Sequence, residues 1–136
     1  MKHLISTITA LLIAVLCTVS CQKDGGWTFY YPQETLCGGT WNGTAVYTDN
    51  HWVDITSPMF SNLQFSIRFN TDGTYYGRGY FGNGSGTYKA SGKTITTYVD
   101  GNLFYTYTVK TMTGNEAELT MTSAKGSSID IRVRKD

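Results

Sequence analysis

The sequence contains few of the side chains that catalysis, metal binding and disulfide formation require. Its 136 residues include two histidines and three cysteines, and 15% charged residues give a formal net charge of +1. A nucleophilic site needs a base beside its serine or cysteine, and His51 is the only histidine beyond residue 20. Asp49, His51 and Asp54 are the one cluster of possible metal ligands, and no spacing indicates a metal site. We therefore expect a non-catalytic chain without cofactor or metal.

Runs of basic residues and long apolar segments are also missing. Without a basic run, the chain lacks the electrostatic surface typical of nucleic-acid binding, and we expect no nucleic-acid partner. The longest apolar stretch, residues 4–16, is too short to cross a bilayer as a helix. It follows Lys2 and is typical of a signal peptide, so we expect residues 1–20 to be a removable signal.

The residues after this stretch indicate lipid attachment. Ser20 is small and directly precedes Cys21, and this arrangement resembles the lipobox of bacterial lipoproteins. The resemblance implies that Cys21 becomes the lipidated first residue and that the protein is anchored to a membrane of the bacterial cell envelope. We expect the outer membrane, on its periplasmic or surface side. The alternative is an ordinary signal peptide followed by an incidental cysteine.

The rest of the chain has the length of one domain. Residues 21–35 combine a polar, glycine-containing start with an aromatic end. We expect a lipid-anchored tether whose aromatic part packs against the domain or rests at the membrane interface. The domain itself is expected over residues 36–136. Since the other two cysteines lie in the signal and at the lipid site, Cys37 is left as an unpaired thiol, and no disulfide framework is expected.

No segment beyond Leu36 shows apolar residues at helical spacing. Apolar residues alternate with polar ones instead, as in 63–69, 117–121 and 129–133, which is typical of half-buried strands. Glycine-containing turns separate these runs at regular intervals. The pattern predicts eight strands, over residues 39–48, 63–70, 74–81, 85–90, 94–99, 103–112, 116–122 and 128–135.

All but one of the connections are short enough for hairpins, so consecutive strands should be antiparallel neighbours. Eight such strands can close on themselves, which removes both exposed edges. We therefore expect an all-β domain, a small eight-stranded antiparallel up-and-down β-barrel. A two-sheet sandwich is the alternative, but its crossings need longer loops than most of those found here.

The one long connection, residues 47–62, is rich in apolar side chains. Loops of this length are commonly functional or disordered, and the apolar content argues against disorder. We expect it to form a lid over one barrel mouth, at the end where the turns at 82–84, 100–102 and 123–127 also lie. A small ligand bound there would contact the lid and the neighbouring strand ends. The candidate residues are Tyr47, Trp52, Phe60, Phe65, Tyr105 and Met121.

Aromatic residues are concentrated in the predicted strands, and alternation must turn about half of them inward. The simpler interpretation is that the inward rings fill the barrel. The alternative is that they line a binding cavity, in which aromatic faces stack on sugars or flat ligands and hydroxyls orient them.

Gly39, Thr40 and Trp41, at the start of the first predicted strand, match the G-x-W motif of lipocalins, and a hydrophobic loop follows that strand. The segments 69–75 and 86–88 match a pattern found in small lipocalin-like lipoproteins. The whole predicted domain therefore resembles the bacterial lipocalin-like domains of the calycin superfamily.

This resemblance implies a barrel that is closed at the Trp41 end and open at the lid end. Gly39 and Trp41 would be structural motif residues, with the tryptophan as the plug of the closed end. In lipocalins an arginine of the last strand packs beside this tryptophan, and Arg134 is the best match by position.

The same resemblance implies a non-catalytic binding module that holds a small apolar or amphipathic ligand in the barrel mouth. A second possibility is a protein-binding module similar to the periplasmic inhibitors of lysozyme or proteases, which bind through protruding loops. An avidin-like barrel is a third, since residues 39–42 are similar to its first strand, but no tryptophan follows Trp52. An enzyme is the least supported alternative.

Overall fold

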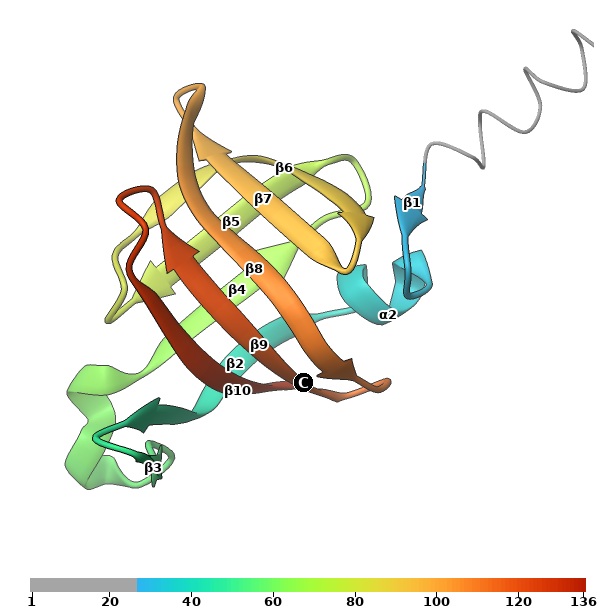
Figure 1. Ribbon diagram of the computed structural model, residues 1–136. Coiled ribbons are helices and arrows are strands. Elements are labelled where there is room, and N and C mark those ends of the chain that lie inside the picture. The colour runs from blue at the N-terminus through green and yellow to red at the C-terminus, as the bar shows by residue number, and fades with distance from the viewer. Residues whose placement is uncertain (1–26) are drawn as a thin grey trace, which may run out of the picture.

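The computed structural model describes residues 27–136, which form a closed β-barrel (Figure 1). The predicted signal, Cys21 and the start of the tether lie outside the described residues. Eight antiparallel strands make the wall, and pairing of β10 with β2 closes it, which confirms the predicted up-and-down barrel. The wall strands are β2 (Thr40–Thr48), β4 (Phe65–Phe69), β5 (Thr74–Gly79), β6 (Gly84–Gly92), β7 (Thr94–Val99), β8 (Asn102–Met112), β9 (Glu116–Ser123) and β10 (Ser128–Lys135).

Four further elements accompany the wall. β1 (Thr28–Phe29) pairs in parallel with β6, and the short helix α2 (Gln33–Cys37) follows it. β3 (His51–Asp54) pairs with the second half of β2, and the 3₁₀ helix η1 (Pro58–Leu63) leads from β3 to β4. None of the helices within residues 27–136 has the length and apolar content needed to span a membrane.

Alternation along the strands decides which side chains fill the barrel. On β4, Phe65 and Ile67 are buried, whereas the outward Arg68 is exposed. This is the period-two pattern expected from the sequence, because successive side chains of a strand point to opposite faces. β9 and β10 repeat it with the buried residues Ala117, Leu119, Met121, Ile131 and Val133.

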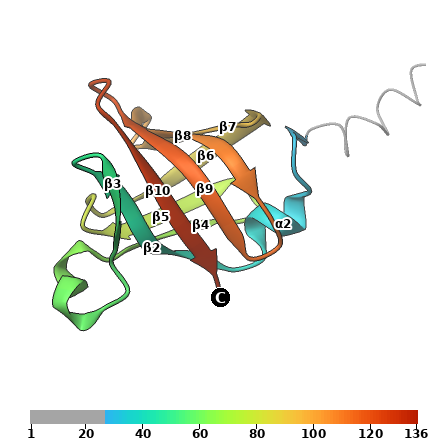
Figure 2. The same ribbon diagram turned by 60° about the horizontal axis from the view of Figure 1, so that its bottom comes forward.

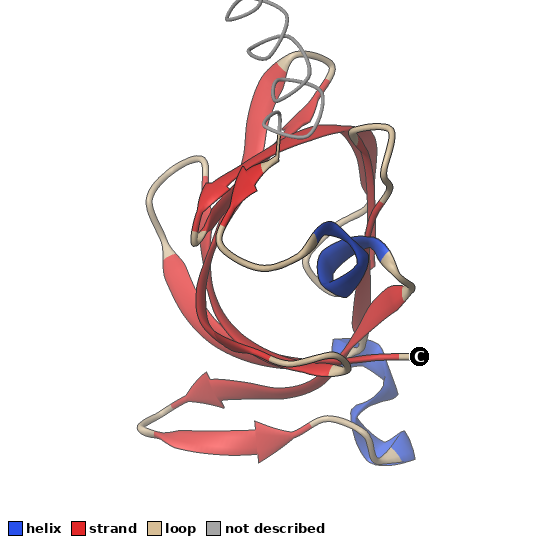
Figure 3. Cartoon of the chain, turned by 90° about the vertical axis from the view of Figure 1, so that its right-hand side faces the viewer, coloured by secondary structure: helices blue, strands red, loops and turns tan. Residues whose placement is uncertain are grey.

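The end of the barrel near Trp41 is closed by α2. Trp41 is 2% exposed, and its Nε1 donates a hydrogen bond to the Leu36 carbonyl oxygen at 3.0 Å. Leu36 itself is fully buried, and Gly39 is buried as well. Figure 3 shows α2 lying within the opening of the strand ring. Much of the predicted tether thus packs against this end of the barrel.

The expectation for Arg134 needs correction. Arg134 pairs with Asn42 in the sheet and points outward, where its Nη2 lies 3.0 Å from Glu116 Oε2. The cation over the indole is Lys135, whose Nζ is 5.1 Å from the Trp41 ring centroid. Successive side chains of a strand point to opposite faces of the sheet. Lys135, the residue after Arg134 on β10, is the one that pairs with Trp41, so it lies on the same face as the indole and Arg134 lies on the other.

β2 changes partner halfway along, and this shapes the outside of the barrel. Residues 40–42 pair with β4, whereas residues 45–48 pair with β3. Asp49 and Asn50, with φ values of 52° and 65°, make the tight turn of the β2–β3 hairpin. The hairpin and η1 lie beside the strand ring (Figure 3), at the opposite end from α2 (Figure 2). The 47–62 connection is therefore not the predicted lid.

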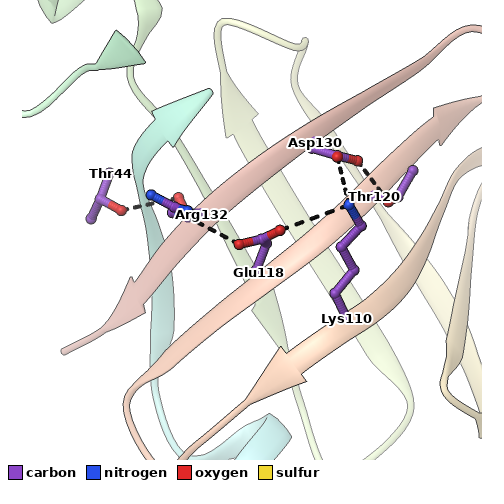
Figure 4. Close-up of polar contacts among 6 residues, drawn as sticks. All are labelled: Thr44, Lys110, Glu118, Thr120, Asp130 and Arg132. Atoms are coloured by element: carbon purple, nitrogen blue, oxygen red, sulfur yellow. Dashed lines mark hydrogen bonds and ion pairs between the residues drawn. The ribbon is translucent and has the colours of Figure 1, made fainter. Parts of the chain in front are cut away.

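The outer faces of β8, β9 and β10 carry a ladder of compensated charges (Figure 4). Lys110 Nζ lies 2.7 Å from Asp130 Oδ2 and 3.7 Å from Glu118 Oε2, and Arg132 Nε lies 3.2 Å from Glu118 Oε1. Thr120 Oγ1 also donates to Asp130 at 2.7 Å. Water screens these partly exposed pairs, so they add little stability. Within residues 27–136, Lys110, Glu118, Asp130 and Arg132 each have a charged partner on this wall.

Candidate ligand-binding site

The interior of the barrel is filled by side chains. Phe65, Tyr105 and Met121 surround a gap of only about 10 Å³. Tyr75 and Tyr107 cross the centre, with their hydroxyl oxygens 3.2 Å apart. Burial raises the pKa of both phenols above the ordinary value, which keeps the pair neutral. A gap of this size holds about one water molecule, so the inward rings act as core.

The barrel mouth is covered by the β5–β6 turn. Phe81 packs edge-on against Phe65 with ring centroids 4.9 Å apart, and the Tyr105 hydroxyl donates to the Phe81 carbonyl oxygen at 3.1 Å. Phe104 lines the same gap from β8. Phe81 was expected inside a strand, but β5 ends at Gly79, whose φ is 109°. The turn therefore carries Phe81 over the mouth.

The six predicted ligand contacts separate into groups. Phe65, Tyr105 and Met121 lie together in the filled interior. Tyr47 and Trp52 stack edge-on at 5.4 Å on the β2–β3 hairpin, with the Arg132 guanidinium 3.8 Å above the Trp52 ring centroid. Phe60, on η1, is half-buried against the edge of the core. The structure does not bring the six into one site.

A large depression lies outside the wall, where β2 turns away from β4. Its volume is about 820 Å³, within the range of about 300–1,000 Å³ usual for ligand sites. We call it the outer cleft and define it by its polar side chains. Six of these carry the argument below: Asn42 on β2, Ser66 on β4, Tyr76 and Arg78 on β5, and Gln64 and Asn83 from the adjoining connections. The polar lining is completed by Thr44, Thr56, Arg134, Lys135 and Asp136.

Sheet register explains why these side chains meet. Asn42 pairs with Ser66, and Ser66 pairs with Arg78, so the three form one row across β2, β4 and β5. Each flanks a buried inward residue and so points outward. At the next position of β2, a Cβ on Gly43 would overlap the Phe65 ring, so glycine lets this ring pass beneath the strand. The buried Phe65 ring forms the floor of the outer cleft.

Much of the hydrogen-bonding capacity of the outer cleft is unused. Within residues 27–136, the side chains of Ser66, Tyr76 and Arg78 make no hydrogen bond or ion pair. Gln64 uses its amide nitrogen on the Ile55 carbonyl oxygen at 3.4 Å, which leaves its own oxygen unpaired. Asn83 Oδ1 accepts from the Gly79 amide at 3.0 Å, which leaves the side-chain NH₂ group available as a donor. The arrangement can therefore both donate to and accept from a ligand.

A second groove, of about 690 Å³, borders β1 and the β4–β5 turn. Several of its polar groups already have partners in the protein, although the side chains of Lys89 and Ser91 make no hydrogen bond or ion pair within residues 27–136. Asp72 Oδ1 accepts from the Thr74 hydroxyl at 2.6 Å, and the Tyr88 hydroxyl donates to the Asn70 carbonyl oxygen at 2.9 Å. This groove offers a ligand fewer contacts than the outer cleft.

Cys37 and His51 lie on separate elements, α2 and β3. Burial raises the pKa of the Cys37 thiol, which lies 3.3 Å from the Tyr88 hydroxyl. His51 lies on the exposed hairpin, where its Nδ1 is 3.0 Å from the Asp49 carbonyl oxygen. Within residues 27–136 no group of three or more His, Cys, Asp or Glu residues could hold a metal ion.

No protein-family model matches the chain, and neither does any curated protein. Among the residues that line the outer cleft, Phe65 was a predicted ligand contact and Arg134 a predicted motif residue, whereas the sequence indicated none of the other polar lining residues. Outward polar residues on a strand look like ordinary solvent-facing positions. The one available signal was the alternation on β4 and β5, which places Ser66, Tyr76 and Arg78 outward without showing that a cleft lies above them.

Proposed function

We propose that this chain is a non-catalytic, lipid-anchored, lipocalin-like binding protein of the bacterial cell envelope whose ligand binds in the outer cleft. The proposal is supported by the difference in volume between the outer cleft and the gap inside the barrel. The outer cleft has a volume of about 820 Å³, whereas the gap among Phe65, Tyr105 and Met121 inside the barrel is about 10 Å³. An apolar or amphipathic ligand in the barrel mouth would first have to displace Phe81 and Phe104 from the ring cluster that they complete. The outer cleft needs no such opening.

The site is tested by blocking it. Ser66 lies in the middle of the cross-strand row, so Ser66→Tyr should fill the outer cleft without touching the core. Native mass spectrometry of the protein purified from its own host should show a bound small molecule on the wild type and none on Ser66→Tyr. Thr108→Tyr is the matched control, because Thr108 is an exposed residue on the outer face of β8. This control should retain the molecule.

Two results would contradict the outer cleft as the site. If Ser66→Tyr keeps the bound molecule and Phe81→Ala changes its affinity, binding occurs in the barrel mouth. If a bound protein is found instead, and Trp52→Ala releases it, the β2–β3 hairpin is the binding surface. That second candidate function, a protein-binding module of the inhibitor type, is favoured by one observation. The hairpin and η1 protrude, with Tyr47 39% and Met59 80% exposed.

The anchor is tested separately from the site. Cells that express the wild type and are fed a clickable palmitate analogue should label the protein at Cys21, which follows the small Ser20. Cys21→Ala should lose the label and leave the membrane fraction. Cys37→Ala is the matched control and should keep the label. Continued labelling of Cys21→Ala would show that the lipid is attached elsewhere.

A further inference from the structure

We propose that the ligand of the outer cleft is a carbohydrate that carries a carboxylate, with Arg78 holding the carboxylate and Tyr76 stacking on a sugar ring. This inference rests on the proposed function, because it names the chemistry of the same site. Three features of the outer cleft support it: a mixture of neutral donors and acceptors, an exposed aromatic ring, and one cation without a partner.

The uncharged polar side chains of the outer cleft can hydrogen-bond to the hydroxyl groups of a sugar. Asn42 and Gln64 each present a carbonyl oxygen, because their nitrogens already donate to backbone oxygens at 3.3 and 3.4 Å. Asn83 presents an NH₂ group, and the Ser66 hydroxyl can serve in either role. A ligand that satisfies such a set must donate and accept from many adjacent atoms. Sugar hydroxyls do both, whereas an apolar ligand would leave these groups without partners.

The aromatic ring is Tyr76. It is 45% exposed, although its neighbour Tyr75 is 2% exposed in the core. On the outer face its cross-strand neighbours are Arg68 and Ser85, so no aromatic side chain covers it there. An exposed ring at the edge of a polar cleft offers a flat face to the C–H face of a sugar ring, while its hydroxyl remains able to hydrogen-bond.

Arg78, Arg134, Lys135 and Asp136 are the charged side chains that line the outer cleft. The Asp136 carboxylate already accepts from the Thr40 amide at 3.1 Å and from Asn42 Nδ2 at 3.4 Å. Arg134 lies 3.0 Å from Glu116, and Lys135 Nζ donates to the Thr35 carbonyl oxygen at 2.6 Å. Arg68 donates to the Asn70 side-chain oxygen and to the Thr40 hydroxyl, both at 3.1 Å. Within residues 27–136 the Arg78 guanidinium makes no hydrogen bond or ion pair. Its planar N–H groups can donate two parallel hydrogen bonds to the two oxygens of one carboxylate. One free cation fits one carboxylate better than a densely charged polyanion such as a nucleic acid.

The test compares sugars that differ in the carboxylate. Isothermal titration calorimetry of the full lipoprotein in detergent would use sialyllactose and trigalacturonate as acidic probes, with the methyl esters of the same two sugars as their neutral counterparts. We expect at least one acidic probe to bind about tenfold or more tightly than its counterpart, because a charge-assisted bidentate pair is added. Arg78→Gln should remove that difference. Tyr76→Ala should weaken binding of the acidic probe, and Tyr76→Phe should keep most of it.

Arg68→Gln is the matched control, because Arg68 is also an outward arginine but does not line the outer cleft. It should bind like the wild type. The inference is overturned if neither acidic probe binds, if acidic and neutral sugars bind equally, or if a polyglutamate peptide binds in place of the sugars. A failed sugar test combined with loss of the co-purified molecule in Ser66→Tyr would refute the carbohydrate and leave the outer cleft as the binding site.

Discussion

Replacing Trp41 with alanine should lower the free energy of unfolding by about 3–5 kcal/mol, the usual range for a buried large aromatic side chain. The indole is 2% exposed and lies between α2 and Lys135. Its removal would open a cavity at the closed end and leave the Leu36 carbonyl oxygen without the donor that now lies 3.0 Å away. Urea unfolding followed by circular dichroism measures the loss.

Trp52→Ala is the matched control, since it makes the same chemical change on the protruding hairpin. Trp52 contacts the Tyr47 ring and the Arg132 guanidinium, but it is only partly buried. We expect this variant to lose less than about 1 kcal/mol. Equal losses in the two variants, or an unchanged melting temperature for Trp41→Ala, would contradict the role of Trp41 in closing the barrel.

Gly86→Ala should destabilise the barrel by about 2–3 kcal/mol, although it adds only one methyl group. A Cβ at Gly86 would overlap the carbonyl oxygen of Tyr98 and lie 3.2 Å from the Cα of Val99. Both atoms belong to the backbone of β7, so no change of side-chain rotamer relieves the clash. β6 and β7 would have to separate at this point of the wall. Thermal unfolding of the purified variant measures the effect.

The matched control for this substitution is Gly114→Ala. Gly114 lies in the turn between β8 and β9, and a Cβ there would meet no atom within 4 Å. Its stability should stay within about 0.5 kcal/mol of the wild type. If Gly86→Ala unfolds at the same temperature as Gly114→Ala, the close approach of β6 to β7 does not require glycine.

The barrel could be predicted because its two determinants are local. Alternation shows which residues of a strand face inward, and glycine-containing turns of a few residues force neighbouring strands to be antiparallel. The prediction of a lid for residues 47–62 was wrong because apolar side chains can be covered either by the core or by one another on a hairpin. Ile55 is fully buried, whereas Tyr47 and Trp52 cover each other on a hairpin. Composition alone does not distinguish these outcomes from a lid.

The outer cleft could not be predicted because it depends on pairing between distant strands. Asn42, Ser66 and Arg78 form one row only in the observed register, and a shift of one residue would turn each to the other face. The cleft also needs β2 to leave β4 after Asn42, and no local pattern marks that point. Lys135 shows the same limit, since its contact with Trp41 depends on the register between β10 and β2.

The pairing of β10 with β2 also has a kinetic consequence. Every other pair of neighbouring wall strands is consecutive in the chain or separated only by β3 and η1, whereas closure joins Asn42 to Arg134. The entropy of this long loop must be lost before the closing contacts form. Closure is thus the one non-local pairing of the wall in the described part of the chain, and non-local pairing slows folding. Until closure, the edges of β2 and β10 are unpaired and available for association with other chains.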